Sequence, residues 1–136
     1  MVDNLTVSQR SYCMSRVRSK DTSIERVVRS ELFKRGYRFR KHVKTLPGRP
    51  DIVFAGKKLA VFIDGGFWHG YRFPQWEHKI SKFWREKIQV TRKRDKRNFQ
   101  KLKRSGWKVI RLWQHDIEKD LNECVERIIY ALTCIK

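Results

Sequence analysis

The sequence predicts a single α/β domain in which helices cover both faces of a mixed sheet. A chain of 136 residues has the length of one domain with one hydrophobic core. Apolar patterns follow one another in the order helix, strands, helix, strand, helix. The segment 59–63 is apolar at every position, which is typical of a central strand covered on both sides. Helices on both sides of a sheet are the natural packing for this order.

The first predicted helix begins near residue 22 and ends before Gly36. Residues 22–25, Thr-Ser-Ile-Glu, fit a capping box, in which two side chains bond the free amides of the first turn. The positions that share one face are Ile24, Val27, Val28, Glu31 and Leu32. Gly36 has the place of a residue that ends a helix. Glu25 has two interpretations, a cap of its own helix or a carboxylate that points towards an acidic site.

Three strands are predicted before the middle of the chain. Residues 37–41 alternate aromatic and basic side chains, which fits a half-exposed strand. After a turn at 47–50, two further strands are predicted at 51–54 and 59–63. The four residues between these two strands give a connection of hairpin length.

The second half of the chain begins with a basic segment. Between Lys79 and Arg104, 12 of 26 residues are Lys or Arg, and the apolar positions among them fit one or two helices. These helices end before Gly106. A strand at 107–113 and an amphipathic helix at 117–134 complete the predicted domain, 1–136.

The formal net charge of +19 is the strongest signal in the composition. Such an excess of one charge is typical of proteins that bind a polyanion. Nucleic acid is the first candidate and an anionic membrane surface is the second. The membrane is less favoured, because no apolar run approaches the roughly 20 residues of a spanning helix and no signal peptide or lipidation motif is present. We therefore expect a cytoplasmic protein with access to DNA.

The cysteines and the N-terminus give weaker indications. Three cysteines, at positions 13, 124 and 134, have no metal-like spacing, which argues against a disulfide framework and against a zinc site made of cysteines. Residues 1–20, which include Arg16 and Arg18, predict a basic arm or a short helix that a partner could order.

Two carboxylates and a histidine suggest a catalytic metal site. Asp51 opens one predicted strand, Asp64 ends the next, and His69 follows five residues later. Hard oxygen ligands of this kind, with a backbone carbonyl such as that of Ile63, suit Mg²⁺. An imidazole near neutrality can act as a base or orient water. Each residue taken alone also has a structural interpretation, as a turn residue, a strand cap or a packed histidine.

Aromatic and basic residues near this site suggest contacts with DNA. Phe67 and Trp68 follow two glycines and form either a core wedge or a wedge inserted between bases, which Trp84 could join. The basic segment forms either a solvated face or a set of phosphate contacts. The predicted phosphate-binding residues within it are Lys87, Arg92, Lys93 and Arg94.

Two motifs resemble the very-short-patch-repair (Vsr) mismatch endonucleases. The first, 46–51, reads Leu-Pro-Gly-Arg-Pro-Asp, and the second, 61–70, reads Val-Phe-Ile-Asp-Gly-Gly-Phe-Trp-His-Gly. The resemblance extends over about residues 8–116. It implies a restriction-endonuclease-like fold of the PD-(D/E)XK type. It also implies an enzyme that uses Mg²⁺ to nick one strand of duplex DNA, 5′ to the thymine of a T·G mismatch.

The resemblance also implies roles for individual residues. Asp51 and the Ile63 carbonyl would bind metal, His69 would activate water and Glu25 would support the site. Asp64 stands where histidine is frequent in the family, which suggests a more direct metal ligand. The residues that match intercalating aromatics are Phe67, Trp68 and Trp84, and those that match positions near the mismatched pair are Met14 and Lys87. The arm would clasp the duplex, and we expect a monomer on the DNA.

The chain departs from the family pattern at a structural zinc site that many members carry. The corresponding positions hold Gly66, Tyr71 and Phe73, with His115 near the last. We expect no zinc, and a turn held instead by packing of Tyr71, Phe73 and Trp76. Thr91 stands where asparagine is frequent, which weakens the expectation of strict sequence recognition.

Three other functions remain as alternatives. A restriction- or homing-type endonuclease on the same fold would act as a dimer and cut matched duplex. A DNA-binding module would bind tightly, with a strong salt dependence, and would not cut. Cleavage of RNA has no motif in its favour.

Overall fold

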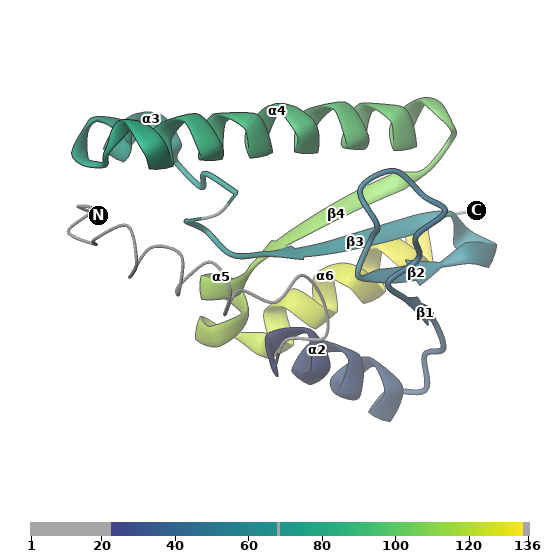
Figure 1. Cartoon of the computed structure of the whole chain (residues 1–136). Helices are drawn as coiled ribbons and strands as arrows, with labels where there is room; N and C mark the ends of the chain where they lie inside the picture. The colour runs from purple at the N-terminus through teal and green to yellow at the C-terminus, as the bar shows by residue number, and fades with distance from the viewer. Residues whose placement is uncertain (1–22, 68, 135–136) are drawn as a thin grey trace.

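The computed structural model describes residues 23–67 and 69–134. It contains a four-stranded mixed sheet with strand order β1-β2-β3-β4 (Figure 1). β1 (Arg40–Lys41) and β3 (Leu59–Asp64) both pair antiparallel with β2 (Ile52–Phe54). β4 (Lys108–Trp113) runs parallel to β3. This architecture confirms the predicted α/β class with a mixed sheet.

Helices lie on both faces of this sheet, as predicted. The helical elements are α2 (Ser23–Lys34), η1 (Ala55–Lys57), α3 (Phe73–Trp76), η2 (Glu77–Lys79), α4 (Lys82–Arg104), α5 (Gln114–Lys119) and α6 (Leu121–Cys134), of which η1 and η2 are 3₁₀ helices. Figure 1 shows α4 on one face, and α2, α5 and α6 on the other. Among the described residues, no helix combines the length and the apolar character needed to cross a membrane.

β3 is buried at all of its six positions, as expected for a central strand. Leu59, Val61 and Ile63 belong to the main core, which is shared with α2 and α6. Ala60 and Phe62 belong to a smaller core that includes side chains of α4. Because side chains alternate along a strand, Asp64 at the end of β3 points to the α4 side.

α2 ends before Gly36, as the sequence predicts. Gly36 has a φ of +93°, which glycine adopts without steric cost. The N–H of Tyr37 then donates to the carbonyl of Leu32 at 3.1 Å and closes the last turn. Thr22, the first residue of the predicted capping box, lies outside the described residues.

Two elements differ from the prediction. The strand predicted at 37–41 is only two residues long, Arg40–Lys41, which pair with Val53 and Ile52 of β2. Phe39, just before it, packs on Phe54 with ring centroids 5.9 Å apart. The single helix predicted at 117–134 is two helices that meet at Asp120. The Asp120 carboxylate accepts the N–H of Glu123 at 3.1 Å and so caps the start of α6.

Several predicted residues lie outside the described part of the chain. They are the arm at 1–20 with Met14, Arg16 and Arg18, the wedge residue Trp68, and Cys13. Of the other two cysteines, Cys124 is buried and Cys134 is exposed, and both are free thiols.

Candidate active site

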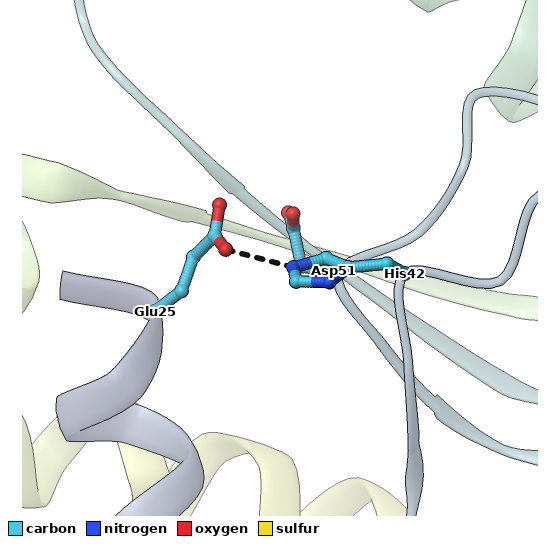
Figure 2. A group of neighbouring side chains, drawn as sticks. All are labelled: Glu25, His42 and Asp51. Carbon is cyan, nitrogen blue, oxygen red and sulfur yellow. Dashed lines mark hydrogen bonds and ion pairs between the residues drawn. The ribbon is translucent and has the colours of Figure 1, made fainter. Parts of the chain in front are cut away.

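The first acidic cluster joins Glu25, His42 and Asp51 from three different parts of the fold (Figure 2). Glu25 lies in the first turn of α2, His42 follows β1 and Asp51 precedes β2. The Nε2 atom of His42 lies 3.0 Å from Oε2 of Glu25. Glu25 is 3% exposed and Asp51 is 7% exposed. Of the two interpretations of Glu25, the structure therefore supports the one in which it points towards the acidic site.

Asp51 is fixed at the end of β3 by a hydrogen bond. The Ile63 N–H donates to its Oδ2 atom at 2.7 Å. Burial raises the pKa of Asp51 to about 8; the Ile63 N–H opposes this rise, and the charges of Glu25 and Asp64 add to it. Two buried carboxyl groups therefore resist carrying negative charge together. A bound cation would offset this repulsion and favour loss of the proton.

The second acidic cluster surrounds His69. Its Nδ1 atom lies 2.6 Å from Oδ2 of Asp95, on the buried side of α4, and its Nε2 atom lies 3.4 Å from Oδ1 of Asp64. Arg111 of β4 bridges the same two acids: Nε donates to Asp64 and Nη2 donates to Asp95, both at 2.8 Å. The structure thus brings Asp64 and His69 together, as predicted, but in a different cluster from Asp51.

Arg111 limits what Asp64 can bind. Burial raises the pKa of Asp64, whereas the charges of His69 and Arg111 lower it. One carboxylate oxygen accepts a hydrogen bond from Arg111 and the other faces His69, so a metal ion at Asp64 has to displace a guanidinium group. Asp64 therefore fits a direct metal-binding role less well than Asp51 does.

The donor sets distinguish the two clusters as metal sites. In the part of the chain that the structure describes, they are the two groups of three side chains whose ligand atoms lie within 4.8 Å of one another. The first group offers two carboxylates and an imidazole, and the Nη1 atom of Arg29 lies 3.7 Å from Oε2 of Glu25 beside them. The second group already contains the Arg111 guanidinium. The first group fits a divalent cation.

The turn after β3 carries its aromatic residues into a ring cluster. Phe67 is half-buried; its ring stacks on Trp76, with centroids 5.6 Å apart and planes at 18°, and meets the edge of Trp84 at 5.6 Å. Trp84 is only 3% exposed, in a small core shared by α3 and α4. Insertion of Trp84 between bases would require this core to open. In this position the Trp84 ring packs against Phe67 and supports it.

Aromatic packing also fills the rest of this turn. The Tyr71 ring lies 4.9 Å from Trp113 and 4.5 Å from His115, measured between ring centroids. Trp76 packs edge-on against Phe73 at 5.2 Å and donates its Nε1–H to the Tyr71 carbonyl at 2.8 Å. The packing of Tyr71, Phe73 and Trp76 that the sequence predicts for this turn is confirmed. The imidazole ring of His115 contacts Tyr71 and Trp113 in this packing.

Basic side chains cover the outer face of α4. Those predicted to bind phosphate and exposed here are Lys87, Arg92, Lys93 and Arg94. A cleft of about 820 Å³ opens beside His69, bounded by α4, β4 and the turn 69–72. Its charged residues besides His69 are all basic, namely Arg72, Arg92, Lys93, Lys96, Lys103 and Arg111. A surface of this charge fits a phosphate backbone.

Three residues that the structure brings to the site were not predicted from the sequence. His42 meets Glu25 17 residues away, Asp95 meets His69 26 residues away, and Arg111 meets Asp64 47 residues away. One feature of the sequence could have indicated Asp95, because it is an acid in a basic helix at a position on the apolar face. No such feature indicated His42 or Arg111, because tertiary packing alone brings them to the site.

Known DNA endonucleases are similar in sequence to this chain. The family described as DNA mismatch endonuclease Vsr matches residues 2–75, just over half of the chain. The chain belongs to the Vsr family. The type II nicking enzyme V.XorIIP of Xanthomonas oryzae pv. oryzae is 44% identical over 119 residues, which are 86% of this chain and 88% of that protein. The DNA mismatch endonuclease Vsr of Escherichia coli K12 is 34% identical over 116 residues, 84% of this chain and 74% of that protein.

A third relative extends over almost the whole chain. The type II nicking enzyme V.NmeDIP of Neisseria meningitidis serogroup C is 37% identical over 134 residues, 96% of this chain and 90% of that protein. Membership of the Vsr family makes the chain a DNA endonuclease with a restriction-endonuclease-like fold. DNA is therefore the polyanion whose binding the net charge of +19 favours.

Proposed function

We propose that this Vsr-family endonuclease nicks one strand of duplex DNA 5′ to the thymine of a T·G mismatch and so initiates very short patch repair. One observation carries the proposal: the end of β3 joins the two clusters. Asp64 contacts His69, the base that Asp95 holds at 2.6 Å, and the N–H of the preceding residue, Ile63, binds Asp51 of the cluster that fits a divalent cation. The name of the Escherichia coli relative, a DNA mismatch endonuclease, supports the mismatch as substrate. The nicking enzymes among the relatives support cleavage of one strand.

Asp51 and Glu25, with the Ile63 carbonyl at the end of β3, would hold Mg²⁺. When bound, Mg²⁺ supplies neutralisation of charge on the phosphate and on the leaving oxygen. Asp51 is aimed by the Ile63 N–H, so its carboxylate needs no reorganisation during the reaction. Because the pKa of Asp51 is raised, binding of a cation there would release a proton.

His69 acts as the base that takes a proton from the attacking water. With its Nδ1–H donating to Asp95, its Nε2 atom is left without a proton and accepts one. Asp64 lies 3.4 Å from Nε2 and stabilises the charged imidazole that results. Arg111 holds both acids in place through its two donors.

DNA is held by the wedge and by the basic surface. Phe67 and Trp68 open the base stack beside the mismatch, and Trp84 supports Phe67 from below. The residues that contact phosphate are Arg92, Lys93 and Arg94 on α4, with Arg16 and Arg18 on the arm that clasps the duplex. Met14 and Lys87 lie near the mismatched pair. One active site cuts one strand, so the enzyme works as a monomer, in the cytoplasm where the nucleoid is accessible.

A strand-resolved nicking assay tests this function. Duplexes with each mismatch, and a matched duplex, are labelled on one strand at a time and incubated with Mg²⁺ or with EDTA. We expect a single cut, in the thymine strand of the T·G duplex, only with Mg²⁺. Equal cutting of both strands of matched duplex would indicate a restriction-type endonuclease instead, and binding without any cut would indicate a DNA-binding module.

A further inference from the structure

Backbone geometry holds His42 against the acidic cluster. The register of β1 and β2 pairs Lys41 with Ile52, so the next pair along the strands sets His42 opposite Asp51. The His42 N–H donates to the Asp51 carbonyl at 3.2 Å. Directly opposite residues of antiparallel strands place their side chains close together on one face. His42 also has a φ of +50°, and non-glycine residues adopt this conformation chiefly where neighbouring contacts impose it, often at functional sites.

The distances within the cluster match those of ligands that share one ion. His42 Nε2 and Glu25 Oε2 lie 3.0 Å apart, and Figure 2 shows the Asp51 carboxylate beside the same imidazole ring. Two ligands about 2.1 Å from one ion and at right angles are themselves separated by about 3 Å. The His42 side chain is 16% exposed and that of Glu25 is 4% exposed, so both donors are largely withdrawn from water.

We propose that His42 supplies a nitrogen ligand to the divalent metal at the Glu25–His42–Asp51 cluster, and that this ligand makes the site prefer Mn²⁺ and Co²⁺ to Mg²⁺. The inference rests on the proposed function, because it assumes a metal at this cluster. Mg²⁺ favours carboxylate, carbonyl and water oxygens, whereas an imidazole binds Mn²⁺ and, more strongly, Co²⁺. One imidazole in an otherwise oxygen-based site therefore changes metal selectivity.

A second role for His42 has to be separated from this one. The imidazole could act only on Glu25, through the 3.0 Å contact, and orient it without touching the metal. Loss of such a positioning residue weakens the binding of all metals alike, by about 10- to 100-fold. Loss of a nitrogen ligand changes the ratio between metals and removes the magnetic coupling between the metal and a nitrogen nucleus.

The test is electron spin-echo spectroscopy of Mn²⁺ bound to the full chain, together with calorimetric titration of Mn²⁺ and Mg²⁺. We expect ¹⁴N modulation from one imidazole in the wild-type protein and no modulation in His42→Gln. In His42→Gln, the affinity for Mn²⁺ falls about tenfold or more, while the affinity for Mg²⁺ changes less than about threefold. Equal losses for both metals, with the modulation retained, would overturn the proposal.

Two histidine variants serve as controls. His78→Gln removes an exposed histidine on η2 and should leave both measurements unchanged. His69→Gln removes the imidazole of the other cluster and should retain the modulation. If the modulation is lost in His69→Gln instead, the metal lies at the second cluster and the proposal fails.

A further measurement covers the case in which His42→Gln does not fold. Wild-type protein with ¹⁵N-labelled histidine should replace the ¹⁴N pattern with a ¹⁵N pattern, and His69→Gln labelled in the same way should keep it. Wild-type protein that nicks DNA with Mg²⁺ but shows no nitrogen coupling would contradict this inference alone. Wild-type protein that binds neither metal and does not nick would contradict the proposed function itself.

Discussion

The Nδ1 atom of His69 lies 2.6 Å from the Oδ2 atom of Asp95, although the two residues are 26 positions apart. The contact joins the turn after β3 to the middle of α4. It fixes the ring so that Nε2 faces Asp64. The position of α4 on the sheet therefore determines the orientation of the proposed base.

Replacement of Asp95 tests this orientation. In Asp95→Asn, the new amide can offer an N–H where His69 needs an acceptor, which favours the wrong tautomer of the imidazole. We expect the single-turnover nicking rate to fall about 100-fold, with DNA affinity unchanged within about threefold. Glu86→Gln, an exposed acid on the same helix, is the matched control and should cut at the wild-type rate. A wild-type nicking rate in Asp95→Asn would show that the contact between α4 and His69 plays no part in the reaction.

Replacement of Arg111 tests the cation between the two acids. Asp64 and Asp95 are each 9% exposed, so Arg111→Leu leaves two buried carboxylates without their guanidinium. We expect a loss of about 3 kcal/mol in the free energy of unfolding, measured with urea at pH 7. Adding Asp64→Asn to Arg111→Leu should restore part of that loss, because one of the two charges is removed. Arg104→Leu, at an exposed position of α4, should have little effect, and an equal loss there would contradict this account of Arg111.

The raised pKa of Asp51 predicts how stability depends on pH. Folding raises this pKa from 3.8 to about 8, so between these values the folded state binds a proton that the unfolded state does not. The stability of the metal-free protein should therefore fall as the pH rises from about 4 to 8. Asp51→Asn removes this dependence and should exceed the wild type by about 2 kcal/mol or more at pH 8, but not near pH 4. A wild type that gains stability over this range, relative to Asp51→Asn, would show that Asp51 is ionised without a metal.

Gly70 allows the turn to approach α4. Its φ is +71°, and a Cβ atom there would lie 2.6 Å from Cδ of Arg92 and 3.1 Å from Cγ2 of Ile88. The exposed Arg92 side chain can move away, but the backbone conformation remains strained. Gly70→Ala should therefore lower the free energy of unfolding by about 1–2 kcal/mol. Gly56→Ala, where nothing lies within 4 Å, is the comparison variant, and an equal loss in both would rule out a special role for Gly70.

The sequence predicted the elements whose signal is local. The apolar run of β3, Gly36 at the end of α2 and the basic pattern of α4 each depend on neighbouring residues, and each is present in the structure. The short helix α3 was missed, because four residues are too few for a periodic pattern. The break at Asp120 was missed, because apolar spacing continues across it and only the cap of α6 reveals it.

The site was predicted in part for the same reason. Asp51, Asp64 and His69 could be identified because they lie in or beside two motifs. Their division into two clusters could not, since His42 and Arg111 reach the motifs only when β1 and β4 join the sheet. Trp84 shows another limit: the sequence left open whether this aromatic residue of a basic helix packs in the core or joins a wedge between bases. The structure packs its ring, 3% exposed, against Phe67.

The central claim is that Asp51 belongs to a metal site that cuts the thymine strand at a T·G mismatch. The most direct test is the single-turnover rate of nicking of that strand with Mg²⁺, compared between the wild type and Asp51→Asn, whose folding the pH experiment verifies independently. We predict a rate at least about 1,000-fold lower for Asp51→Asn, with the matched duplex uncut by either protein. Equal rates for the two proteins, or equal cutting of matched duplex by the wild type, would contradict the account.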